Sequence, residues 1–157
     1  MSAAENPAPR KDPLAFYLDK AVPDAWKAVG GLAAAVRTAA EEAGLDRQLV
    51  ELVNLRVSQI NGCAFCLGKH AETLRGQGVS QAKLDRLAGW RISELFDARE
   101  RAALEWAETL TAVAEKGAPD AAYEPLKAQF SDAEIADLTF AVALMNAFNR
   151  LAVGMKL

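Results

Sequence analysis

Apolar side chains recur three and four residues apart along most of the chain from about Leu14 onward, and no segment sustains an alternation with a period of two. A spacing of three and four residues places side chains on one face of an α-helix, whereas a period of two is typical of a strand. The pattern therefore predicts an all-α protein, a bundle of about six or seven helices.

Capping residues and glycines divide this pattern into separate helices. Asp46 is placed to cap one helix, and Asn61 and Gly62 are placed to end it, because both residue types tolerate the left-handed backbone conformation of a helix exit. Two later segments begin with Asp or Ser followed three positions on by Glu, which is the arrangement of a capping box. The expected helices cover residues 23–44, 46–61, 63–76, 80–87 and 97–117, and a last one begins at 131.

Length and composition favour one globular domain. A chain of 157 residues can bury one hydrophobic core but is too short to argue for two domains, and its 52% apolar and 25% charged residues are ordinary for a globular protein. Residues 1–12 are polar and rich in proline, which predicts a flexible tail ahead of a single helical domain over residues 13–157.

Charge and hydropathy argue against two classes of partner. The net charge of −3, with scattered basic residues, disfavours binding to nucleic acid, because phosphate recognition needs concentrated Lys and Arg. The first residues lack the apolar stretch of a secretory signal, and no run approaches the ~20 apolar residues of a membrane helix. We therefore expect a cytoplasmic protein with no membrane partner, and in that compartment a structural disulfide is unusual.

Two cysteines, Cys63 and Cys66, lie three positions apart at the expected start of a helix. At that spacing side chains share a helix face with Cβ atoms about 5–6 Å apart. The first helical turn, preceded by Gly62, can adjust toward the roughly 3.5–4.5 Å that a disulfide needs. The free amides and the positive dipole end of a helix lower the pKa of a thiol. The pair is therefore a candidate redox-active Cys-x-x-Cys motif with a reactive thiolate.

His70 is the one histidine of the chain, and it follows Cys66 by four positions and Cys63 by seven. This spacing places all three side chains on one stripe of the expected helix. Glu51 lies on the preceding helix, and the turn at Asn61 can fold it back toward the cysteines. An imidazole and a carboxylate beside two thiols can take a proton from a thiol and deliver one to a leaving alkoxide.

Other interpretations of these residues stay open. The two cysteines can be small buried apolar residues. Together with His70 and Glu51 they also supply four zinc ligands, although three would come from one helix and structural zinc usually takes two separated pairs. Covalent haem is excluded because Leu67, and not histidine, follows the second cysteine.

Tryptophans and late polar residues are assigned structural roles. The tryptophans are expected in the core or at a subunit interface, with a pocket wall as the alternative for one of them. Polar residues near the end of the last helix are expected to bond a neighbouring helix or subunit, with the wall behind Cys66 as the alternative. The residues concerned are Trp26, Trp90, Trp106, Asn146, Asn149 and Arg150.

The segment from Glu51 to His70, ELVNLRVSQINGCAFCLGKH, resembles the core motif of the carboxymuconolactone decarboxylase superfamily, in particular its alkylhydroperoxidase D-like (AhpD-like) branch. That motif joins a glutamate, an Arg-x-Ser-Gln-x-Asn run, Cys-x-x-Cys and a histidine four residues after the second cysteine. The separation of 12 residues between Glu51 and Cys63 also fits. A looser similarity extends through residues 90–106 and 146–150. The resemblance implies an AhpD-like helical bundle.

The resemblance also implies roles for four residues in a peroxidase that acts on hydroperoxides. Cys66 would attack the hydroperoxide and become a sulfenic acid, and Cys63 would resolve it as a disulfide. Glu51 and His70 would form the proton relay. No metal, haem, flavin or other cofactor is implied.

Two kinds of partner follow from the resemblance. A dithiol electron donor would return the enzyme to its reduced state, and in the best-known members of the family this donor is a lipoylated protein. Members assemble as homo-oligomers, trimers or hexamers, with the site near subunit contacts.

The sequence departs from some alkylhydroperoxidases at Phe65, where those members carry a second histidine. The apolar residue leaves the relay with one imidazole, so the resemblance does not fix the strength of the peroxidase activity or its substrate. Two further functions stay open: a redox-responsive assembly protein without turnover, and a catalyst of the same fold acting on a lactone or organic acid. True decarboxylase members lack the cysteine pair, which argues against lactone decarboxylation.

Overall fold

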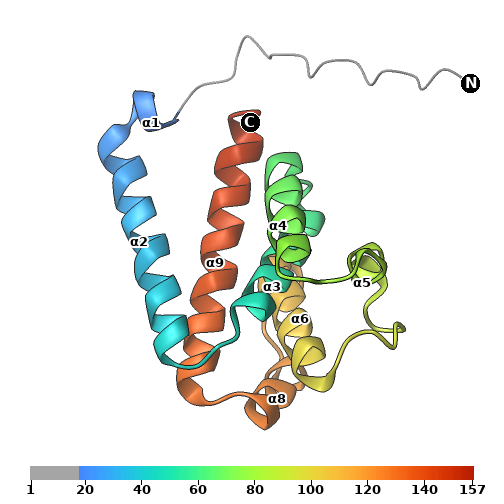
Figure 1. Cartoon of the computed structure of the whole chain (residues 1–157). Helices are drawn as coiled ribbons and strands as arrows, with labels where there is room; N and C mark the ends of the chain where they lie inside the picture. Colours follow the sequence, from blue (N-terminus) through green and yellow to red (C-terminus); the bar gives the residue numbers. More distant parts are fainter. Residues whose placement is uncertain (1–17) are drawn as a thin grey trace, which may run out of the picture.

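In the computed structural model, residues 18–157 are described, and within this range the chain forms helices and no strand (Figure 1). The helices in chain order are α1 (Leu18–Ala21), α2 (Pro23–Glu42), α3 (Arg47–Asn61), α4 (Ala64–Gly76), α5 (Gln81–Asp85), the 3₁₀ turn η1 (Leu87–Gly89), α6 (Ala98–Thr111), α7 (Val113–Lys116), α8 (Asp120–Gln129) and α9 (Asp132–Gly154). The all-α prediction is confirmed. The tail expected over residues 1–12 lies outside the described residues.

The boundaries of α3, which carries Glu51, are those that the sequence predicts. The Asp46 side chain accepts a hydrogen bond from the Gln48 amide at 3.0 Å and caps the start of the helix. Gly62 ends it in the left-handed conformation, at φ +66° and ψ +31°. This exit turns the chain sharply, so that α4 packs back against α3. The two helices that carry the candidate residues are therefore neighbours.

Both predicted capping boxes are present. In α6 the Asp97 side chain accepts the Glu100 amide at 2.8 Å, and the Glu100 carboxylate accepts the Asp97 amide at 3.0 Å. In α9 the same reciprocal bonds join Ser131 and Glu134. Each box satisfies two backbone donors that a helix start leaves free.

The region between residues 80 and 131 differs from the predicted helices. The short helix expected over 80–87 is α5 followed by η1, and the helix expected to reach 117 is interrupted at Ala112 between α6 and α7. The sequence pattern also missed α8, which follows Pro119 and contains Pro125. Prolines are usual helix breakers, but α8 persists because Ala122 and Leu126 bury one face of it in the core.

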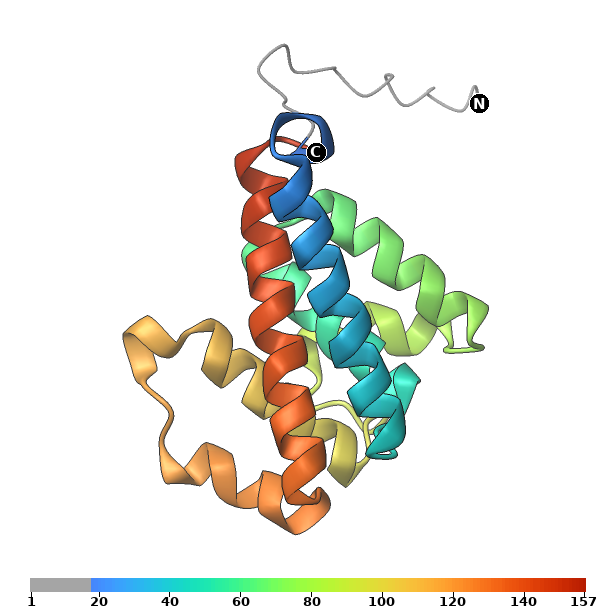
Figure 2. The same ribbon diagram turned by 90° about the vertical axis from the view of Figure 1, so that its left-hand side faces the viewer.

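Two apolar clusters share α3 and α6. One cluster joins α3, α6, α8 and α9 with Ala40 of α2, and the other joins α3, α4, α5, η1 and α6. Helix α9 runs the length of the molecule beside α2 (Figures 1 and 2), and its last turns approach the start of α4, where Ala152 packs with Cys63 and Cys66. The cysteine pair is therefore held between α4 and the end of α9.

Helix α2 is an unusual member of the bundle. Of its 20 residues only Ala40 is buried, although the helix is amphipathic and packs along α9. Gly30 and Gly31 lie inside it without breaking it. Helix α2 therefore leaves space between itself and the rest of the bundle. Among the helices of residues 18–157, none is both long and apolar enough to cross a membrane.

Replacing Gly62 by alanine is expected to destabilise the protein by about 1–2 kcal/mol, because a Cβ is strained at positive φ. Gly68→Ala is the matched control, since Gly68 lies inside α4 with nothing within 4 Å of an added Cβ. That change should stabilise the helix by about 0.5–1 kcal/mol. Urea unfolding of both variants measures the difference, and equal effects at the two positions would contradict the prediction.

Candidate active site

Cys63 occupies the N-cap position of α4. Its Sγ accepts a hydrogen bond from the Cys66 amide at 3.3 Å, and its own amide bonds the Ser58 carbonyl at 3.1 Å. Both sulfurs are free thiols and both residues are buried, Cys63 being 1% and Cys66 6% exposed. The start of a helix at the cysteines is confirmed. The amide at this end of α4 bonds to the sulfur of Cys63 and not to that of Cys66.

Burial, and after it the hydrogen bond and charge of Cys63, raise the pKa of the Cys66 thiol to about 11. A hydrogen bond from Asn149 and the charge of Lys69 lower it, but by less. The lowered thiol pKa expected at the helix start is therefore not found at Cys66, because desolvation of the sulfur and the contact with Cys63 outweigh the contributions that lower its pKa. Cys66 is a neutral thiol near pH 7 and needs a base to react as a nucleophile.

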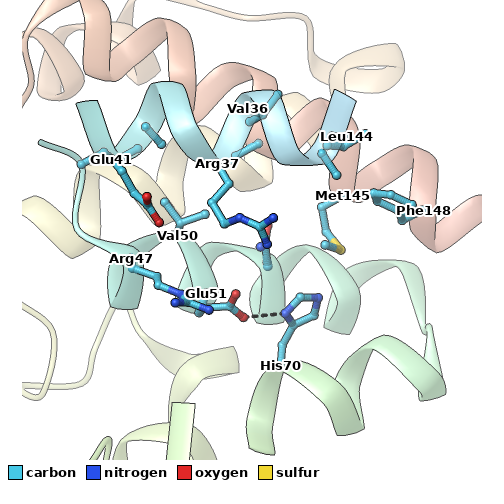
Figure 3. A pocket seen from close by; sticks show the side chains of 15 residues that line it. Val36, Arg37, Glu41, Arg47, Val50, Glu51, His70, Leu144, Met145 and Phe148 are labelled. Atoms are coloured by element: carbon cyan, nitrogen blue, oxygen red, sulfur yellow. Dashed lines mark hydrogen bonds and ion pairs between the residues drawn. The ribbon is translucent and has the colours of Figure 1, made fainter. Parts of the chain in front are cut away.

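Glu51 and His70 are joined across α3 and α4. His70 Nδ1 lies 2.7 Å from Glu51 Oε2, and both side chains are largely buried (Figure 3). A carboxylate can only accept a hydrogen bond, so Nδ1 carries the proton and Nε2 of the neutral ring is free to accept one. Glu51 is thus folded back onto the helix that carries the cysteines, as the turn at Gly62 suggested.

A cavity of about 420 Å³ adjoins Cys66 between α2, α4 and α9. Its walls are mostly apolar, and Cys66, Lys69 and His70 are its reactive or charged members, whereas Cys63 does not line it. The lining residues are Leu18, Trp26, Gly30, Ala33, Phe65, Cys66, Lys69, His70, Met145, Phe148, Leu151, Ala152 and Leu157. Cys66 is therefore the sulfur that a molecule in this cavity can reach.

The four predicted site residues lie on or beside the wall of the Cys66 cavity. Cys66 and His70 share the cavity wall, Glu51 contacts His70, and Cys63 lies behind Cys66. Within the described part of the chain no hydrogen bond joins His70 to either sulfur, so proton transfer between His70 and Cys66 needs a water molecule or a substrate oxygen between them. In residues 18–157 no three His, Cys, Asp or Glu side chains gather into a metal-binding group, and the zinc alternative finds no support in the geometry.

Asn149 is the site residue that the sequence interpretation underrated. It is 0% exposed, its Nδ2 donates to Ser58 Oγ at 3.1 Å, and its Oδ1 accepts from Asn61 at 3.0 Å. It also hydrogen-bonds Cys66, lowering the pKa of that thiol. The structural role favoured for Asn149 is thus present, since it bonds α3, whereas it does not line the Cys66 cavity. The feature of the sequence that pointed to Asn149 was an amide side chain among the apolar residues of the last helix.

The tryptophans divide between the two expected roles. Trp90 and Trp106 are buried, and their indole N–H groups donate to Glu108 at 2.8 Å and Thr139 at 3.0 Å. Trp26 on α2 lines the Cys66 cavity. Phe65 is 56% exposed at the same cavity, so the residue that replaces a histidine of other members lies at its rim.

Among the proteins similar to this chain are two of unknown function and an alkyl hydroperoxide reductase. A solved structure of a protein of unknown function from Agrobacterium tumefaciens, proposed to be the antioxidant defence protein AhpD, superposes with a TM-score of 0.85 at 40% identity and covers 91% of this chain and 95% of that one. The uncharacterized protein YdfG of Bacillus subtilis is 30% identical over 115 residues, 73% of this chain and 78% of YdfG. A segment of 38 residues is 53% identical to the alkyl hydroperoxide reductase AhpD of Nocardia farcinica, over 24% of this chain and 21% of that protein.

The sequence model of the carboxymuconolactone decarboxylase family matches residues 22–109, more than half of the chain. The matched range contains Glu51, both cysteines and His70. The fold, the motif and these similarities agree, and the chain belongs to the carboxymuconolactone decarboxylase family, in its AhpD-like branch.

Proposed function

We propose that the protein is a thiol-dependent peroxidase that reduces organic hydroperoxides through Cys66 and Cys63. The observation that carries the proposal is the placement of Cys66 on the wall of an apolar cavity, beside His70 and one helical turn from a second free thiol. The apolar walls suit an organic hydroperoxide better than a small polar one. The AhpD names of the similar proteins support the same class of reaction.

The reaction begins with deprotonation of Cys66. His70 Nε2, oriented by the Glu51 carboxylate, accepts the Cys66 proton through a bridging water molecule or the substrate itself. The thiolate then attacks the terminal oxygen of the hydroperoxide. The O–O bond breaks, Cys66 becomes a sulfenic acid, and the alkoxide leaves as an alcohol after taking the proton from His70.

Cys63 completes the first half of the cycle. Its thiol attacks the Cys66 sulfenic sulfur, water leaves, and a Cys63–Cys66 disulfide forms, so that one hydroperoxide and two thiols give one alcohol, one water and one disulfide. Cys63 occupies the N-cap of α4, and its Sγ accepts a hydrogen bond from the Cys66 amide at 3.3 Å, so its sulfur already lies against the residue that it would attack. An external dithiol then reduces the disulfide and is itself oxidised.

The proposal extends to an electron donor, a cellular compartment and an oligomeric state. The electron donor is a dithiol, for which a lipoylated protein is one candidate, and the reducing cytoplasm is the expected compartment. We also propose a homo-oligomer. Large apolar side chains at the start of α2, within α2, on α9 and at residue 157 are exposed, and a second copy would cover them: Val22, Leu32, Phe140, Val153 and Leu157.

Loss of two free thiols per chain on reaction with one equivalent of cumene hydroperoxide is the expected result. The thiols are counted before and after the reaction, and the alcohol product is quantified together with the disulfide. Catalytic turnover should follow when a dithiol such as dihydrolipoamide is added. Survival of both thiols would overturn the proposal, and oxidation that changes the oligomer mass without turnover would point to a redox-responsive assembly protein.

A further inference from the structure

A second cavity, of about 200 Å³, lies between α2, α3 and α9 and adjoins the Cys66 cavity. The two cavities share four lining residues, and His70 is one of them: Ala33, His70, Met145 and Phe148. Glu51 and His70, the proton relay of the proposed reaction, line this second space, which we call the arginine cavity, but the reaction as described places no ligand in it. Together the two cavities fall within the roughly 300–1,000 Å³ typical of ligand sites.

The arginine cavity is amphipathic. Val36, Val50, Leu144, Met145 and Phe148 form its apolar walls. Its opposite end carries the side chains of Arg37 from α2 and Arg47 from α3, whose guanidinium groups are turned toward the space near Glu51 (Figure 3).

These guanidinium groups are not engaged by the protein. In the part of the chain that the structure describes, neither Arg37 nor Arg47 forms a hydrogen bond or an ion pair, although other arginines such as Arg56 do. The nearby carboxylate of Glu51 is held by His70 at 2.7 Å. Asn54 Oδ1, also on the cavity wall, is buried without a hydrogen-bond partner. The two guanidinium groups thus face a cavity whose other polar lining residues are Glu41, Glu51, Asn54 and His70 and whose remaining walls are apolar.

Glu41 and Glu51 are the acidic residues on this cavity wall, and Glu41 is exposed on α2, four residues after Arg37. No ion pair joins it to either arginine in the described residues. Its charge opposes binding of an anion, and it is exposed to solvent in the same way as Arg37 and Arg47, whereas Glu51 is less exposed and is paired with His70. Replacing Glu41 therefore tests whether charge on the cavity wall affects the binding of an anion.

We propose that the arginine cavity binds the carboxylate of an elongated, mostly apolar hydroperoxide, such as that of a long-chain fatty acid, while the peroxide group lies at Cys66 in the adjoining cavity. This inference rests on the proposed peroxidase function and names its substrate class. Guanidinium groups bind carboxylates with two parallel hydrogen bonds, and the apolar residues shared by the two cavities cover the chain between the ends.

The kinetic test compares a fatty acid hydroperoxide with its methyl ester, which has the same chain and no charge. For the wild type, kcat/KM should favour the acid, and Arg37→Gln and Arg47→Gln should each raise KM for the acid by about tenfold or more with little change in kcat. The ester should be unaffected. Glu41→Gln should lower KM for the acid, and Arg75→Gln, which removes a charge at the far end of α4, is the matched control.

A binding measurement separates this inference from the peroxidase proposal. Calorimetric titration with a saturated fatty acid, which has no peroxide group, should give binding that the matching alcohol lacks and that the Arg37 and Arg47 variants lose. Such binding without peroxide turnover would support the arginine cavity as the carboxylate site and overturn the proposal that the protein is a peroxidase. Equal binding of acid and alcohol, or a preference for the acid that depends on Lys69 and not on the two arginines, would overturn the arginine cavity as the carboxylate site.

Discussion

Cys66→Ser is expected to lower the rate of hydroperoxide reduction by about 10³-fold or more, as loss of a nucleophile does in other enzymes. Cys66 lines the apolar cavity, whereas Cys63 is 1% exposed and lies behind it. Cys63→Ser should therefore still consume one equivalent of hydroperoxide and stop at the sulfenic acid, because no second thiol is in place to release water from it. The serine hydroxyl replaces the thiol with little change in size.

The measurement is single-turnover consumption of hydroperoxide, with a sulfenic acid trap and mass spectrometry of the labelled peptide. The trap should label Cys66 in the Cys63→Ser protein and should label nothing in the Cys66→Ser protein. Circular dichroism of both variants controls for folding, since both side chains are buried. A labelled Cys63 in the Cys66→Ser protein would reverse the two assignments.

The fold was predictable where boundary signals are local. Asp46, Gly62 and the two capping boxes act through bonds within three residues, and each stands where the sequence places it. Helix α8 could not be predicted in this way, because Pro119 and Pro125 are local breaking signals. Its stability comes from the burial of Leu126 among residues of α3, α6 and α9, which are distant in sequence.

The candidate site was predictable in its members but not in its electrostatics. Cys66 and His70 share a wall because they lie four residues apart on one helix. Cys63 departs from the expected stripe, since an N-cap residue has extended backbone angles, here φ −82° and ψ 96°. The pKa of Cys66 depends on burial against the end of α9, where Ala152 and Asn149 lie more than 80 residues away in sequence.

The arginine cavity could not be predicted from sequence motifs. Arg37 lies on α2, outside the Glu51–His70 segment, and nothing in its spacing marks it as different from other surface arginines. Its position opposite Arg47 follows from the way α2 packs along α9 and leaves space over α3. Chemistry that depends on the gap between two packed helices leaves no local signal in the sequence.

His70→Asn is expected to lower kcat/KM at pH 7 by about 10²–10⁴-fold, the usual contribution of a general base. With the pKa of the Cys66 thiol at about 11, only about one thiol in 10⁴ is ionised at pH 7 without assistance. Glu51→Gln should cause a smaller loss, because the imidazole remains but its Nδ1 partner at 2.7 Å no longer carries a charge. Glu72→Gln, an exposed change on the same helix as His70, is the matched control.

The pH dependence distinguishes loss of a base from loss of structure. A raised thiol pKa means that the thiolate fraction grows as the pH rises toward that pKa, so the His70→Asn rate should climb about tenfold per pH unit between pH 7 and 10 and approach the wild-type rate. The wild type should depend on pH much less over this range, because His70 supplies the base. In the double variant the two losses should not add, since Glu51 acts through His70. Parallel pH profiles for the wild type and His70→Asn, or fully additive losses, would show that the pair acts on the stability of the α3–α4 junction and takes no part in proton transfer.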